Sequence, residues 1–102
     1  MLDEKMIKKS SLDKISTVLE RYDIKAKKAL SQNFIFDLNL TEKIVHSMGD
    51  IDNHDILEIG PGPGGLTRSL LSLGARRVIA IEKDKQFIKP LEEISVSYPG
   101  RL

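Results

Sequence analysis

The chain has 102 residues, 40% of them hydrophobic and 30% charged, and its 16 basic and 15 acidic side chains give a formal charge of +1. This composition is ordinary for a folded domain and excludes a fibrous chain, while the absence of cysteine excludes disulfides, thiolate metal sites and cysteine nucleophiles. No apolar run reaches the ~20 residues of a membrane span, and the first residues do not resemble a signal peptide, so we expect no membrane contact and a cytoplasmic location.

The first ten residues have no hydrophobic period, so we expect a disordered stretch over 1–10 and one folded unit over 11–102. The spacing of apolar residues predicts a helix from Ser10 to near Asp23. A second helix should follow Asn39 as its N-cap and end at Gly49. Its expected buried face consists of Leu40, Ile44, Val45 and Met48.

Two short apolar runs, Ile56–Ile59 and Val78–Glu82, read as buried strands. The helix between them should end at Gly74, and a further helix should follow Asp84 as its cap, with its start moved or its axis bent by Pro90. This order predicts a βαβα unit with two parallel strands, preceded by two helices. Because parallel sheets are normally wider and covered on both faces, we expect the chain to be part of a longer α/β domain.

A glycine-rich loop, Gly60-Pro-Gly-Pro-Gly-Gly65, joins the first strand to its helix. Glycine is needed where the backbone takes positive φ or where a ligand approaches it closely. Glu82 ends the second strand, at the same edge of the sheet, where its carboxylate can accept hydrogen bonds from ribose hydroxyls. The sequence therefore predicts a nucleoside cofactor at this edge.

The choice of cofactor stays open at this point. Gly60, Gly62 and Gly65 satisfy the G-x-G-x-x-G pattern of nicotinamide dinucleotide domains, and the same geometry serves S-adenosylmethionine. The Glu58-Ile-Gly-Pro-Gly beginning of the motif favours the methyl donor. Glu58 itself is expected to hydrogen-bond amides of the loop, since a buried carboxylate without partners is costly.

Three segments resemble one known family at matching spacing: Ser31-Gln-Asn-Phe-Ile-Phe-Asp37, Glu58-Ile-Gly-Pro-Gly-Pro-Gly-Gly-Leu-Thr67 and Val78-Ile-Ala-Ile-Glu-Lys-Asp84. They are similar to the KsgA-type small-subunit rRNA adenine dimethyltransferases. The resemblance implies the N-terminal, cofactor-binding portion of a Rossmann-like class I methyltransferase. Such enzymes use S-adenosylmethionine to dimethylate N6 of two adjacent adenosines.

The resemblance also implies roles for individual residues. Asn33 and Ile35, with Gln32 beside them, would line the cofactor site from the segment before the first strand. Gly60 and Gly62 would form the loop under the cofactor, and Glu82 would bind its ribose.

Ser31 departs from the family, which usually has glycine there, and resembles the erythromycin-resistance methylases of large-subunit rRNA instead. The Asn-Leu-Pro-Tyr-type catalytic motif of both families does not occur in these 102 residues. The expected partner is small-subunit rRNA or the pre-30S particle, and the chain alone is expected to be inactive or nearly so.

Two alternatives belong to other functional classes. One is a nicotinamide dinucleotide domain, and the other is a non-catalytic RNA-binding module that uses Lys25, Lys27 and Lys28. His46 and His54 have no further ligand nearby in the sequence, so no metal site is expected.

Overall fold

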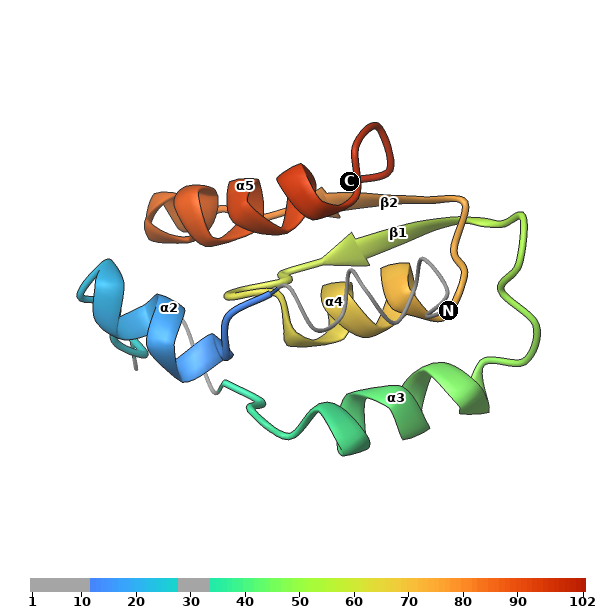
Figure 1. The fold of residues 1–102 in the computed structure, drawn as a ribbon, viewed down its shortest axis with the longest axis horizontal. Helices are drawn as coiled ribbons and strands as arrows, with labels where there is room; N and C mark the ends of the chain where they lie inside the picture. Colours follow the sequence, from blue (N-terminus) through green and yellow to red (C-terminus); the bar gives the residue numbers. More distant parts are fainter. Residues whose placement is uncertain (1–11, 28–33) are drawn as a thin grey trace, which may run out of the picture.

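The computed structural model describes residues 12–27 and 34–102 (Figure 1). The described helices are α2 (Ile15–Arg21), α3 (Leu38–Ser47), α4 (Gly65–Ser72) and α5 (Ile88–Ser97), with a short 3-10 helix, η2 (Lys85–Phe87). The strands are β1 (Asp55–Ile59) and β2 (Arg77–Ile81). The predicted α/β class and the predicted order of elements are confirmed.

β1 and β2 form a parallel pair in which Leu57 lies opposite Ile79 and Ile59 opposite Ile81. These four side chains share one face of the sheet and are 50–70% exposed, whereas Val78 on the other face is buried. The prediction of fully buried strands is therefore correct for one face only. The reason is that α4 and α5, which share the main core with Val78, cover the face that carries it.

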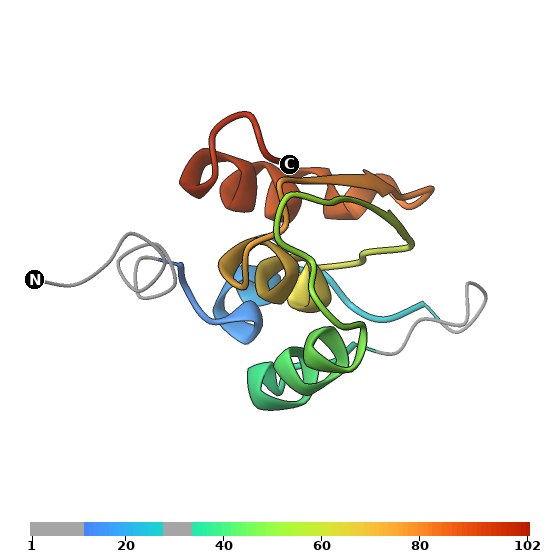
Figure 2. The same cartoon turned by 90° about the vertical axis from the view of Figure 1, so that its right-hand side faces the viewer.

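The helices α5, α4 and α3 follow one another in a row (Figure 2). The main core lies between α4, α5 and β2 and is extended by α3 and the loops. Its buried members are Val45, Ile51, Leu70, Leu71, Ala75, Val78, Ile94 and Tyr98. A second cluster joins α2 to η2 and consists of Ile15, Leu19, Ile24 and Phe87. This second cluster sets the position of α2 against the turn that follows β2.

Both N-terminal helices begin at positions that differ from the prediction. α2 begins at Ile15, and Ser10, where the predicted helix starts, lies outside the described residues together with the rest of the stretch 1–10. α3 is capped by Asp37, whose carboxylate accepts a hydrogen bond from the Asn39 amide at 2.9 Å. The predicted cap Asn39 is thus wrong by two residues, because the acid before it already satisfies a free amide of the first turn.

The buried face of α3 also differs from the prediction. Val45 is buried as expected, but Leu40, Ile44 and Met48 are 36–50% exposed, and Thr41 is fully buried instead. α3 packs against α4 through the Thr41 side, where the Thr41 and Ser69 hydroxyls lie 2.7 Å apart. A polar contact, which hydropathy does not detect, sets the rotation of this helix.

The C-terminal part agrees more closely with the prediction. Asp84 caps η2, and α5 begins at Ile88, so that Pro90 falls in the first turn, where no intrahelical N–H is required. After α5 the chain turns back toward the sheet. The Val78 amide, on the outer edge of β2, donates to the Arg101 carbonyl at 2.7 Å.

Candidate functional site

The glycine loop leaves β1 at its carboxyl end and enters α4 directly. Gly60 and Gly62 have φ of +70° and +55°, values that L-residues with a side chain rarely adopt. The Gly60 amide donates to the Ile81 carbonyl at 2.8 Å, which holds the loop against the end of β2. A Cβ built on either glycine meets nothing within 4 Å. The loop backbone is therefore open to a ligand.

A cavity lies beside this loop. It is lined by Phe34, Ile35, Glu58, Ile59, Gly60, Pro61, Gly62, Pro63, Gly65 and Leu66. The predicted residues Ile35, Gly60 and Gly62 thus line one space, although 25 positions or more separate the first from the others. The segment that precedes α3 and the loop that follows β1 form its two walls.

Gly65 allows these two walls to come together. It is the first residue of α4, and a Cβ built there lies 2.8 Å from the Ile35 carbonyl oxygen and 3.2 Å from Ile15 Cδ1. Any larger residue would displace the backbone of residue 35. The third glycine of the motif is therefore required for the close approach of the Ile35 segment to α4.

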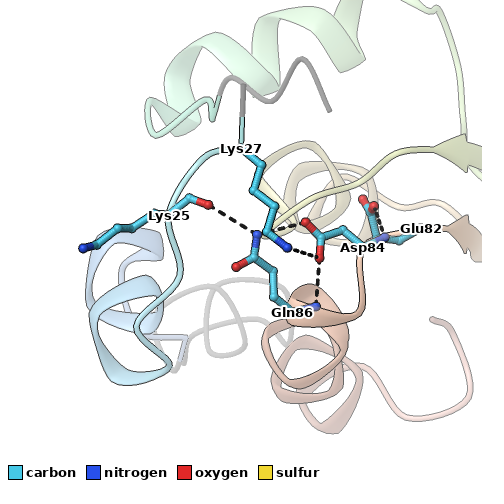
Figure 3. A network of polar contacts seen from close by, with 5 residues as sticks. All are labelled: Lys25, Lys27, Glu82, Asp84 and Gln86. Carbon is cyan, nitrogen blue, oxygen red and sulfur yellow. Dashed lines mark hydrogen bonds and ion pairs between the residues drawn. The ribbon is translucent and has the colours of Figure 1, made fainter. Parts of the chain in front are cut away.

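The Glu82 carboxylate faces the loop (Figure 3). Its Oε1 accepts from the Gly62 amide at 2.9 Å, and its Oε2 accepts from the Asp84 amide at 2.9 Å. Each carboxylate oxygen has a further lone pair, so the group can still accept from a ligand. The predicted role of Glu82 as the ribose-binding acid stays a prediction; its position beside the loop is compatible with that role.

Glu58 has a different partner from the one predicted. Its carboxylate accepts a hydrogen bond from the Thr67 hydroxyl at 2.5 Å, rather than from loop amides. The Thr67 hydroxyl comes from α4, which packs on the same face of β1. Burial raises the pKa of Glu58; the Thr67 hydrogen bond opposes this rise and the nearby Glu82 charge adds to it.

The remaining predicted site residues, Gln32 and Asn33, lie outside the described residues. Their roles stay predictions. The described part of the chain adds polar residues that the sequence did not assign to the cofactor site: Lys27, Asp84 and Gln86 form a network beside Glu82 (Figure 3). The cap pattern at Asp84 was the only local signal for this network.

The basic segment before residue 28 is partly neutralised. Lys27 forms an ion pair with Asp84, at 3.4 Å between Nζ and Oδ1, and Lys28 lies outside the described residues. This pairing lowers the positive charge available for a phosphate backbone and weakens the RNA-binding-module alternative.

Residues 12–27 and 34–102 contain neither a candidate metal site nor a membrane-spanning helix. No group of three or more His, Asp or Glu side chains is arranged to hold a metal ion there. No helix in the same ranges is long and apolar enough to cross a membrane.

Comparison with known proteins decides the family. The model of the ribosomal RNA adenine dimethylase family matches residues 23–99. This chain belongs to the ribosomal RNA adenine dimethylase family. The predicted resemblance and the Rossmann-like methyltransferase fold are confirmed.

Individual relatives agree with this family assignment. The chain is 58% identical over 91 residues to ribosomal RNA small subunit methyltransferase A of Mesorhizobium japonicum, and 57% identical over 91 residues to the protein of the same name in Chelativorans. Each match covers 89% of this chain and 33% of the relative, so the chain spans about a third of their length. A solved structure of a proposed RNA methyltransferase from Pyrococcus horikoshii matches 99% of this chain and 49% of its own, with a TM-score of 0.66 and 26% identity.

Proposed function

We propose that this chain forms the S-adenosylmethionine-binding part of an enzyme that dimethylates N6 of two adjacent adenosines in small-subunit rRNA. Family membership and the small-subunit names of its relatives support this target over the single large-subunit adenine of the erythromycin-resistance methylases. The partner is small-subunit rRNA or its precursor particle, and the reaction takes place in the cytoplasm.

The residues beside the glycine loop fit this cofactor. Gly60 and Gly62 present bare backbone next to open space, and Ile35 offers an apolar contact on the opposite wall. Glu82 holds the loop through the Gly62 amide and offers its remaining lone pairs to the ribose hydroxyls. Gln32 and Asn33 are assigned to the methionine end. The bound cofactor supplies an electrophilic methyl group on a sulfonium.

The charge of the residues around the cavity is the observation that supports S-adenosylmethionine as the cofactor. Glu58 lines the cavity, and the Glu82 carboxylate accepts a hydrogen bond from the Gly62 amide of the loop that forms one wall. No Lys or Arg is among the described residues that line the cavity. S-adenosylmethionine has a sulfonium and an ammonium group, which this acidic site attracts. The pyrophosphate of a nicotinamide dinucleotide carries two negative charges and would lie beside Glu58 with no described Lys or Arg to neutralise it. The charge therefore favours the methyl donor.

Base recognition is assigned to no residue of this chain. An adenine that is methylated on N6 has to be extruded from its stack and aligned with the methyl group. The Asn-Leu-Pro-Tyr-type motif that performs this step in the family does not occur among the 102 residues. The chain therefore contributes the methyl-donor side of the site.

Calorimetric titration tests this proposal. We expect the chain to bind S-adenosylmethionine and S-adenosylhomocysteine and to bind NAD more weakly. Glu82→Ala should lower the affinity for S-adenosylhomocysteine by about tenfold or more, since charge-assisted hydrogen bonds are lost. Glu20→Ala, which removes an exposed acid on α2, is the control and should leave the affinity unchanged. Tighter binding of NAD, or equal affinity in both variants, would refute the proposal.

A matched pair of glycines locates the ligand. Gly60 and Gly100 have φ of +70° and +73°, and a Cβ on either meets nothing within 4 Å. Gly60→Ala and Gly100→Ala should therefore cost similar stability, about 1 kcal/mol each. Only Gly60 lines the cavity, so only Gly60→Ala should weaken binding of S-adenosylhomocysteine. Equal binding by the two variants would place the ligand elsewhere.

A further inference from the structure

The 3-10 helix η2 (Lys85–Phe87) contacts the segment that leaves α2. The Gln86 side-chain amide donates to the Lys25 carbonyl at 3.3 Å. The Lys27 ammonium reaches Asp84, the cap of η2, at 3.4 Å (Figure 3). Residues 25 to 27 are thus attached to the turn that follows β2, about 60 positions later in the sequence.

Asp84 connects this attachment to the site. Its carboxylate accepts from the Gln86 backbone amide at 3.1 Å and from the Gln86 side-chain amide at 2.9 Å. Its own amide donates to Glu82 Oε2 at 2.9 Å, while Glu82 Oε1 accepts from Gly62. A continuous series of polar contacts therefore runs from Lys27 through Asp84 and Glu82 to the glycine loop.

The same turn also holds the opposite wall of the cavity. The Phe34 ring packs edge to face on the Phe87 ring, with centroids 5.5 Å apart and an interplanar angle of 88°. Phe87 is 1% exposed and ends η2, whereas Phe34 lines the cavity next to Ile35. One turn thus contacts both the Ile35 segment and the acid beside the loop.

We infer that η2 with its cap aligns the two walls of the cofactor site, and that Lys27 is a positioning residue that holds Glu82 through Asp84. The inference rests on the proposed function because it assigns the alignment to cofactor binding. Lys27 does not line the cavity and is connected to it through the cap.

The two partners of the ion pair differ in exposure, and this decides which one to change. The Asp84 side chain is 4% exposed and also caps η2, so its removal would disturb the fold. The Lys27 side chain is 52% exposed, so its truncation is tolerated by the fold. Lys25 provides a matched control because the network uses its carbonyl, and its ammonium points away from the other four residues in Figure 3.

The first measurement is the affinity for S-adenosylhomocysteine in the full chain. Lys27→Met should weaken binding by about three- to fivefold, the effect of losing one partly buried ion pair. Lys25→Met, which removes the same charge from the same segment, should bind as the unchanged chain does. Lys27→Arg should restore most of the affinity. In an Asp84→Asn background, Lys27→Met should have no further effect.

The second measurement needs no ligand. The Gly62 and Asp84 amides both donate to Glu82, so their hydrogen exchange, followed by NMR, reports how firmly its carboxylate is held. Lys27→Met should speed both exchange rates, and Lys25→Met should not. Equal rates in the two variants would overturn the inference even if the cofactor binds. Faster exchange in Lys27→Met without any binding of cofactor would support the alignment and refute the proposed function instead.

Discussion

Glu58 brings a carboxylate into an otherwise apolar strand, and it is only 8% exposed. Burial raises its pKa above the ordinary value of 4.5, so the folded chain binds a proton at Glu58 more tightly than the unfolded chain does. The free energy of unfolding therefore falls as the pH rises from about 4.5 through the raised pKa. The charged form of Glu58 thus lowers stability at neutral and alkaline pH.

Glu58→Gln should remove this pH dependence. The amide oxygen still accepts from the Thr67 hydroxyl, and no charge is buried. We expect the variant to be as stable as the unchanged chain at acidic pH and more stable at alkaline pH, as measured by urea unfolding across the pH range. A constant difference in unfolding free energy between the two proteins at every pH would contradict this explanation.

At the scale of single elements, α3 shows what hydropathy misses. Its apolar residues mark a broad face, and the side that packs on α4 carries Thr41 and Val45. The Thr41 hydroxyl donates to the Leu38 carbonyl at 3.0 Å and meets the Ser69 hydroxyl at 2.7 Å. The sequence therefore predicted the helix itself but not its rotation, which depends on a hydrogen bond between residues 28 positions apart.

Thr41→Val tests this contact. The substitution nearly preserves side-chain volume and leaves the buried Ser69 hydroxyl without its Thr41 partner, so the free energy of unfolding should fall by about 1–2 kcal/mol. Thr17→Val, at an exposed position of α2, is the control and should change it by less than about 0.5 kcal/mol. Urea unfolding measures both; an equal effect of the two substitutions would show that the hydroxyl pair contributes nothing.

The parts of the candidate site that follow from the order of elements could be predicted from the sequence. The contacts between residues far apart in the chain could not. Parallel strands joined by one crossover have their carboxyl ends at one edge, so the proximity of Gly62 and Glu82 follows from the predicted order of elements. The contacts of Lys27 with Asp84 and of Gln86 with the Lys25 carbonyl span 57 and 61 positions and leave no periodic pattern in the sequence. Only the folded chain reveals them.

For the whole molecule, the outer face of the sheet is the main departure from expectation. Leu57 and Ile79 are neighbours across the two strands and are 62% and 50% exposed. An exposed apolar patch of this kind favours association. We therefore expect the 102-residue chain to self-associate with rising concentration, as followed by sedimentation equilibrium.

A double substitution should reduce this association. Leu57→Thr with Ile79→Thr places a β-branched, strand-compatible side chain at both positions and should change stability by no more than about 0.5 kcal/mol per site. Val96→Thr removes an apolar residue that is 79% exposed on α5, away from the sheet face, and should leave association unchanged. Association that persists unchanged in the double variant would show that Leu57 and Ile79 do not drive it.

The contact between Val78 and Arg101 has a consequence for how this sheet can grow. The Val78 amide already donates to the Arg101 carbonyl. The Arg101 side chain is held in turn, because it donates to the Leu71 and Ala75 carbonyls. Another strand that pairs with the outer edge of β2 cannot accept a hydrogen bond from the Val78 amide, so it can pair only beyond Val78. The occupied amide therefore reduces the number of registers in which another strand can pair with this edge, and so disfavours some of the slipped pairings that lead to aggregates.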